Sequence, residues 1–230
     1  MFRIRSRFGF VLPVIFLLTL SGCAQRPADE RPAVENPIIV AASKNNVNDL
    51  ARLLINDAAA NSTNRAGLTA LMLAASYGNA EAVDQLLLSR ADPNRVDRDG
   101  NTALMLASLA GFDRIVQRLL ESGANPGLIN KAGFTALNIA AAAGKAEVVA
   151  RLLKRGIDID QTTGRGDTSL LLATAAGHGA VVALLLDRGA NPHHPNAKGT
   201  TAAQVAMKLR NPTLVELFRA REKTVPVKSP

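Results

Sequence analysis

A pattern of glycine and threonine recurs every 33 residues through most of this 230-residue sequence. Each glycine of the pattern is followed two residues later by a threonine. The two columns are Gly67, Gly100, Gly133, Gly166 and Gly199, and Thr69, Thr102, Thr135, Thr168 and Thr201. A fixed period of this length is typical of proteins that stack one supersecondary unit many times. Because a single unit cannot bury its own apolar face, the period predicts a solenoid stabilised by contacts between neighbouring units.

Each unit is predicted to contain two helices. The column threonine precedes an apolar stretch such as residues 70–75, and its hydroxyl can accept a hydrogen bond from the first helical turn, so it is the expected N-cap. Glycines suited to the left-handed end of this helix follow at Gly78, Gly111, Gly144 and Gly177. In the second helix, apolar pairs one turn apart, as in 115–116 and 119–120, line one face. This helix is expected to end at Gly123, Gly156 and Gly189.

Composition agrees with helices and excludes a disordered chain. Apolar residues make up 47% of the sequence, with no Trp and one Tyr. The core must therefore come from Leu, Ala, Val and Ile, and the abundance of Ala and Leu favours helices over strands. An apolar fraction this high is incompatible with wholesale disorder.

The unit resembles the ankyrin repeat, which has the same period and consists of a projecting finger followed by two antiparallel helices. The family's Gly-x-Thr-Pro-Leu-His is present as the sequence Gly-Leu-Thr-Ala-Leu-Met at 67–72 and in three further close copies. Gly, Thr and Leu match, whereas Ala replaces Pro. The family's His, which joins finger to helix, is replaced by Met72, Met105, Asn138 and Leu171. The resemblance implies an all-α ankyrin-repeat solenoid of about six helix-turn-helix units with loop or β-hairpin fingers.

The repeats are predicted to occupy residues 34–223. The first unit lacks the column glycine, and the last has Arg210 in place of the helix-ending glycine, as terminal capping units can. The units are 34–66, 67–99, 100–132, 133–165, 166–198 and 199–223, followed by a tail at 224–230 that is expected to be disordered.

The first 22 residues are predicted to be a signal peptide, since three arginines precede the apolar segment 8–20. A membrane-spanning helix is the alternative, but it needs about 20 apolar residues.

The sequence Leu-Ser-Gly-Cys at 20–23 resembles a bacterial lipobox, which implies cleavage before Cys23 and acylation of its thiol and new N-terminus. The alternative is an incidental thiol at the end of a signal helix. Because Ala24 rather than Asp follows, the resemblance implies the outer membrane, facing the periplasm.

The segment 23–33 is predicted to be the lipidated cysteine and a flexible tether, rich in Pro and charge. Counted to residue 36, about thirteen residues extended at roughly 3.3 Å each would reach about 43 Å from the membrane. Stable anchoring takes two or more acyl chains.

The sequence provides no recognisable catalytic, metal or cofactor site. Adjacent His193 and His194 lack the further ligands of a zinc site. His178 follows a glycine where the ankyrin pattern often has His, so it is expected to be a turn residue. No Gly-rich phosphate loop or Ser/His/Asp set is recognisable. The loop carboxylates are expected to be repeat-loop residues; they are Asp97, Asp99, Asp158, Asp160 and Asp167.

Basic residues recur in the predicted fingers. Arg65, Arg98 and Lys131 share one column, and Arg165 and Lys198 share the next. Such a row would attract an acidic protein surface, although solvated loop residues are the alternative interpretation. The net charge of +8 lacks the concentrated stripes of a nucleic-acid binder, so no nucleic acid is expected as partner.

Apolar side chains near the fingers are candidate anchors for a partner if they are exposed. They include Tyr77 and Leu109 on the first helices and Phe134, which could instead pack on its neighbouring finger. The predicted partner-binding residues are Arg65, Leu68, Tyr77, Arg98, Asn101, Lys131, Phe134, Arg165 and Lys198.

These features predict a non-enzymatic, monomeric protein-binding module whose concave finger surface binds a periplasmic protein and whose membrane contact is the lipid anchor alone. Two specific roles compete, an immunity-type inhibitor of a toxic periplasmic enzyme and a scaffold or protector of a resident one. The alternative class is an enzyme or enzyme subunit.

Overall fold

The computed structural model describes residues 36–224. The predicted signal peptide (1–22), Cys23 with its tether (23–33) and the tail from residue 225 onward lie outside the described residues.

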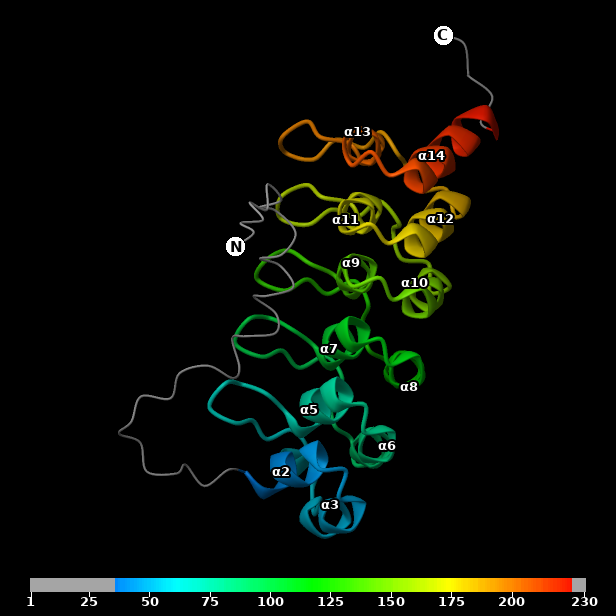
Figure 1. Ribbon diagram of the computed structural model, residues 1–230. Coiled ribbons are helices and arrows are strands. Elements are labelled where there is room, and N and C mark those ends of the chain that lie inside the picture. Colours follow the sequence, from blue (N-terminus) through cyan, green and yellow to red (C-terminus); the bar gives the residue numbers. More distant parts are fainter. Residues whose placement is uncertain (1–35, 225–230) are drawn as a thin grey trace, which may run out of the picture. The chain divides into compact units, whose positions relative to one another are not determined.

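Helices in the described residues alternate along the chain between an inner and an outer stack (Figure 1). Within a repeat the two helices contact each other, and each helix contacts the next one in its own stack. The inner stack comprises α2 (Pro37–Ser43), α5 (Ala70–Tyr77), α7 (Ala103–Ala110), α9 (Ala136–Ala142), α11 (Ser169–Ala176) and α13 (Ala202–Lys208). The outer stack comprises α3 (Val47–Leu53), α6 (Ala80–Leu88), α8 (Asp113–Glu121), α10 (Ala146–Leu153), α12 (Gly179–Asp187) and α14 (Pro212–Thr224). The predicted all-α solenoid is confirmed.

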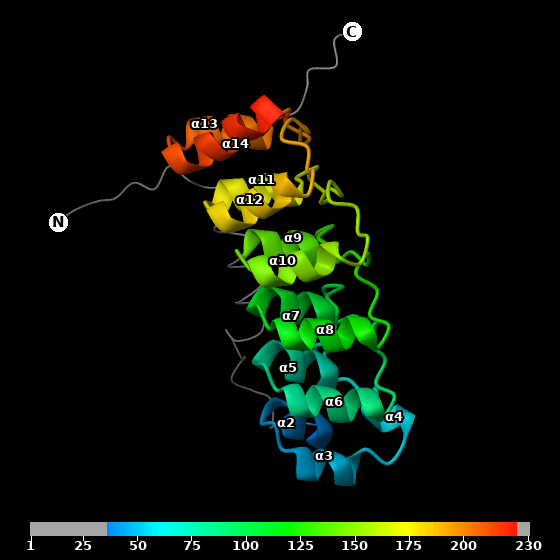
Figure 2. The same ribbon diagram turned by 90° about the vertical axis from the view of Figure 1, so that its right-hand side faces the viewer.

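A short helix that was not predicted, α4 (Asp57–Ala60), follows α3 in the first repeat (Figure 2). The equivalent segments of the other described repeats are turns. The first repeat therefore departs from the others between its outer helix and its finger.

The column threonines begin the inner helices, as predicted. Each of the five has extended backbone and accepts a hydrogen bond from the N–H three residues later, at 3.2 to 3.3 Å. Each cap satisfies one N–H that the first helical turn leaves without a helical partner. Glycines in the left-handed conformation follow α5, α7 and α11, with φ values of 80°, 88° and 80°.

Among residues 36–224, three residues other than glycine have a positive φ, and all three stand in glycine columns. Asn45 and Arg210, both with φ of 53°, occupy the column of Gly78, and Arg90, with φ of 58°, occupies that of Gly123. The repeat geometry therefore imposes the left-handed conformation even where the sequence lacks glycine, at a cost to a residue with a Cβ.

Replacing Arg210 with glycine is expected to raise the free energy of unfolding by about 1 kcal/mol, since glycine adopts the left-handed conformation without steric penalty. Urea denaturation measures the change. Arg210→Ala is the matched control, because it removes the charge but keeps the Cβ, and it should leave stability near that of the wild type. If both variants gain equally, the backbone conformation is not the cause.

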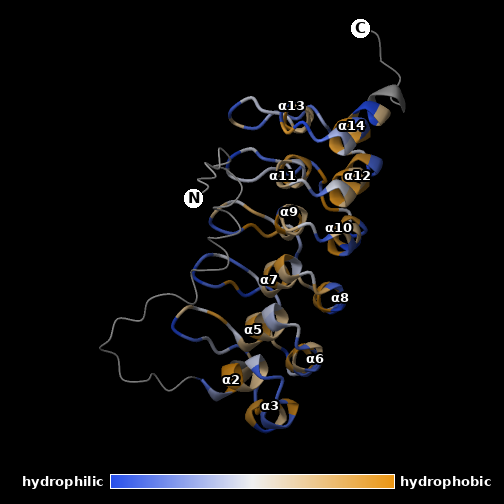
Figure 3. Ribbon diagram, viewed as in Figure 1, coloured by the Kyte–Doolittle hydropathy of each residue, from blue (hydrophilic) through white to orange (hydrophobic). Residues whose placement is uncertain are grey.

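The core lies between the two stacks and between successive repeats. Apolar side chains face one another there, and Figure 3 shows hydrophobic residues along the helices, whereas the finger loops contain stretches of hydrophilic residues. One fully buried column on the outer helices is Leu86, Leu119, Leu152 and Leu185. Within residues 36–224, no helix has both the length and the apolarity needed to cross a membrane.

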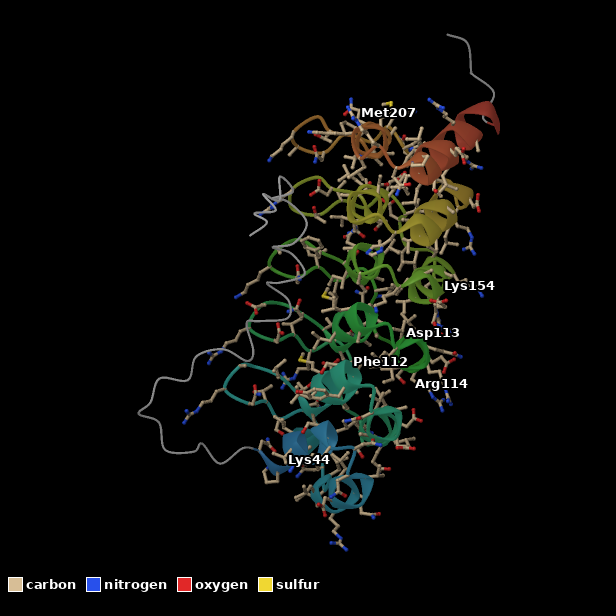
Figure 4. The ribbon with its side chains drawn as sticks, viewed as in Figure 1. Lys44, Phe112, Asp113, Arg114, Lys154 and Met207 are labelled. Carbon is tan, nitrogen blue, oxygen red and sulfur yellow. The ribbon has the colours of Figure 1, made fainter. Side chains whose placement is uncertain are left out.

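An ion pair joins two successive outer helices. Arg151 on α10 donates from Nε and Nη2 to the two carboxylate oxygens of Asp113 on α8, both at 2.5 Å. These hydrogen bonds lower the pKa of Asp113; burial opposes them, and the positive charges of Arg151 and Lys154 add to them. Figure 4 labels Asp113 on α8 and Lys154, the residue that follows α10.

Because the pKa of Asp113 is lowered by folding, its contribution to stability is present above the unfolded value of about 3.9 and is lost as pH falls through the folded value. Asp113→Asn is expected to cost about 0.5 to 1 kcal/mol at pH 7, the usual range for a partly exposed pair. In urea titrations the difference from wild type should shrink as pH falls below the unfolded value, and it should vanish only below the lowered pKa of folded Asp113. A difference that stays constant across this range would contradict the assignment.

Candidate protein-binding surface

Each finger is a tight turn built around one polar residue. The Oδ1 of Asn130 accepts hydrogen bonds from the N–H of Ala132 and Phe134, at 3.1 and 2.9 Å, and its own N–H donates to the Phe134 carbonyl. Side-chain acceptors of this kind are typical of turns. The equivalent residues make the same bonds, and the column is Asn64, Asp97, Asn130, Thr163 and Asn196. This column was not predicted, although its position three residues before each column glycine is visible in the sequence.

Backbone hydrogen bonds join successive fingers. The N–H of Arg98 donates to the Ala66 carbonyl at 3.2 Å, and that of Lys131 donates to the Asp99 carbonyl at 2.9 Å. These bonds fix the finger spacing without using the basic side chains. The predicted basic residues are all exposed; they are Arg65, Arg98, Lys131, Arg165 and Lys198.

Two of the predicted partner-binding residues, Asn101 and Phe134, are buried within the fold. Asn101 is 6% exposed, donates to Asp97 and accepts from Asn130 Nδ2 at 2.9 Å. Phe134 is 8% exposed, which matches the alternative that it packs within the fold. Neither side chain is available to a partner in this conformation.

The other apolar candidates remain accessible to different extents. Tyr77 is 60% exposed at the end of α5, whereas Leu68 and Leu109 are half-buried. Tyr77 and Leu73 share a hollow of about 210 Å³ with finger residue Asn64 and with Val40 of α2. The finger base and the outward side of the inner helices therefore belong to one surface.

That side of the inner helices carries no charge in the four central repeats. Its positions lie four, seven and eight residues after each column threonine, opposite the fully buried positions such as Ala70 and Ala74. At these positions Ile139, Ala142 and Leu172 are buried. The accessible residues are Leu73, Ser76, Tyr77, Leu106, Leu109, Ala110, Ala143, Ala175 and Ala176. We call these residues, together with the five basic finger residues, the concave face. Lysines return at the ends of the array, at Lys44 and Lys208.

At the position that holds histidine in the ankyrin pattern, Asn138 makes the hydrogen bonds between the helix cap and the next repeat. Asn138, fully buried, accepts from the N–H and the hydroxyl of Thr135, at 3.0 and 2.9 Å. Its Nδ2 donates to the Gln161 carbonyl at 3.3 Å and to the Ser169 hydroxyl at 3.0 Å. Asn138 thus links its own helix cap to the next repeat.

His178 and Asp160, two of the histidine and carboxylate candidates, have structural partners. His178 Nε2 lies 3.0 Å from the Ala142 carbonyl, much as Asn79 in the same column donates to the Ala42 carbonyl. Asp160 accepts from the Asn191 N–H and thereby joins two loops. Within the part of the chain that the structure describes, no group of three His, Cys, Asp or Glu side chains is placed to hold a metal ion.

The fold and this surface define a class of protein, a helical repeat solenoid with an extended recognition surface. A family model described as ankyrin repeats (3 copies) matches overlapping segments at 11–97, 38–130, 71–163, 104–196 and 137–227. The crystal structure of an ankyrin repeat domain from Acinetobacter baumannii AYE is similar, with a TM-score of 0.75 and 29% sequence identity. The match covers 82% of this chain and 98% of that domain. No curated protein matches the chain.

The chain belongs to the ankyrin-repeat family. Ankyrin repeats are protein–protein interaction modules, typically without catalytic activity, so a protein partner is the expected ligand.

Proposed function

We propose that this protein is a lipid-anchored module of the cell envelope whose concave face binds an acidic periplasmic protein. The observation that carries the proposal is one basic side chain on each of five successive fingers beside an uncharged stretch of inner helices. A partner with an acidic edge and an apolar strip would complement both parts.

The two parts of the concave face contribute differently to binding. Exposed basic side chains accelerate association with an acidic surface and lose strength as salt screens them. The uncharged helix side, with Tyr77 exposed at 60%, offers the kind of surface that a partner can desolvate at low cost. Because the fingers are fixed by backbone bonds, a partner meets a preformed row of charges.

The location rests on the sequence. The lipobox at 20–23 and Ala24 favour an outer-membrane lipoprotein facing the periplasm. An immunity-type inhibitor and a scaffold would use the same surface, and the identity of the partner separates these two roles.

Cross-linking capture from the membrane fraction tests the proposal. The test variant carries Glu at Arg65, Arg98 and Lys131, and the control carries Glu at Arg114, Arg155 and Arg188, exposed residues in or next to outer helices. Figure 4 shows Arg114 on the outer side of the array. Both variants change the net charge equally.

Capture of one acidic protein by wild type and control, lost in the test variant, would support the concave face as its site. Equal capture by all three proteins would refute the role of the basic fingers. Loss in both variants would indicate that net charge, and not the fingers, drives association. Urea denaturation of both variants checks that each remains folded.

A further inference from the structure

Two largely exposed apolar side chains occupy one column at the ends of the first two outer helices. Ile55, two residues beyond α3, is 81% exposed, and Leu88, the last residue of α6, is 82% exposed. The same column in the next three repeats is charged, with Glu121, Lys154 and Asp187. The apolar character is therefore confined to the N-terminal end of the array.

A second column is apolar in the second and third repeats and holds Thr63 in the first. Val96 and Ile129, each next to the polar residue that organises a finger turn, are 50% and 57% exposed. The corresponding residues of the two following repeats are Thr162 and Pro195. We call Ile55, Leu88, Val96 and Ile129 the apolar edge.

All four residues lie in or beside the segments that connect an outer helix to the next finger. These segments run together along one edge of the array (Figure 2). None of the four belongs to the concave face, so a partner bound there leaves the apolar edge accessible.

Hydrogen bonds hold the connecting segments in place. Asn61 donates to the Arg90 carbonyl at 3.1 Å and accepts from the Asp92 N–H at 2.8 Å. Asn94 repeats the arrangement one unit later, donating to the Gly123 carbonyl at 3.0 Å and accepting from the Asn125 N–H at 2.7 Å. The apolar edge is thus presented by a fixed backbone.

We infer that the apolar edge contacts the lipid surface to which the protein is anchored. The exposed apolar residues lie in the three repeats nearest the tether, and a tether of about 43 Å at full extension keeps those repeats within reach of the bilayer. Between Leu88 and Val96 the exposed charged side chains are Arg90, Arg95 and Asp92, a local excess of positive charge that suits anionic headgroups, whereas Glu121 lies at the start of the next connecting segment. Apolar side chains beside basic ones are typical of interfacial binding. The inference rests on the proposed lipid anchor and adds a second membrane contact to it.

The test uses the mature lipidated protein, in which the acylated Cys23 leaves no other cysteine to label. Leu88→Cys is labelled with an environment-sensitive fluorophore, and Asp187→Cys, in the same column three repeats later, is the matched control. Each protein is reconstituted in phosphatidylethanolamine and phosphatidylglycerol vesicles with or without a lipid-borne quencher.

In vesicles, the emission of the fluorophore at position 88 is expected to shift to shorter wavelength and to lose at least half of its intensity to the quencher. The emission of the fluorophore at position 187 is expected to do neither. A protein that floats with the vesicles while its label at 88 stays aqueous overturns the edge contact alone. Failure to float overturns the anchor and the edge contact together. A blue shift that is insensitive to the quencher and grows with protein density assigns the edge to a second copy of the chain and refutes the lipid contact. Capture of an acidic partner is a separate measurement that none of these outcomes decides.

Discussion

Gly133→Ala is expected to destabilise the protein by about 2 to 5 kcal/mol, because alanine at this position meets two independent obstacles. The φ of Gly133 is +78°, a conformation that penalises any Cβ. A Cβ built there would also lie 2.3 Å from the backbone nitrogen of Gly164 in the next finger. Backbone cannot rotate aside as a side chain does, so the two fingers must separate.

Gly199→Ala isolates the first obstacle. Gly199 belongs to the same column, with φ of +72°, but a Cβ there meets no atom within 4 Å. This control should lose about 1 to 2 kcal/mol, from backbone strain alone. Urea denaturation of the two variants gives the difference, which measures the cost of the contact between fingers. Equal losses would show that the fingers adjust to the Cβ, contrary to the expectation.

Periodicity explains why the architecture could be predicted. A column that recurs every 33 residues identifies residues in equivalent environments, so one physical reason, such as the cap at Thr69, extends to every copy. The left-handed position after the inner helix was predicted for the same reason. The structure extends it to Asn45, a residue type that tolerates this conformation, and to Arg210, where the residue type gave no indication.

Side-chain direction within the fingers could not be predicted in the same way. Phe134 and Asn101 each follow a column glycine, and the sequence places them in a loop without showing which side of it they face. The turn built on Asn130 determines which side they face, because the Asn130 side chain binds the Phe134 N–H and the Asn101 side chain. Recognising the column of turn acceptors would have assigned Asn101 to the fold.

Features that occur in one repeat only could not be predicted from the period either. Helix α4 occurs once, so no period indicates it. The pairing of Asn138 with Ser169 also occurs at one interface, where two columns depart from their usual residues together. Each departure taken alone gave no indication of the hydrogen bond, which needs both residues and the stacking of α9 against α11.

Asn138→Met is expected to lower the free energy of unfolding by about 2 to 3 kcal/mol, since it leaves buried polar groups without a donor. Methionine occupies this column at Met72 and Met105, where the next repeat has alanine rather than serine at the facing position. In the variant, the fully buried Ser169 hydroxyl loses its Asn138 donor, and so does the Gln161 carbonyl.

The double variant Asn138→Met with Ser169→Ala recreates the residue pair of the earlier repeats and should recover about 1 kcal/mol, because the unpaired hydroxyl is removed with its partner. Ser169→Ala alone should be destabilising, since Asn138 Nδ2 would keep one acceptor of two. The effect of Ser169→Ala on the free energy of unfolding therefore changes sign with the residue at position 138, as a direct hydrogen bond requires. A double-mutant cycle in urea measures this coupling. If the two substitutions add without coupling, Asn138 stabilises the array through its cap at Thr135 and not through the next repeat.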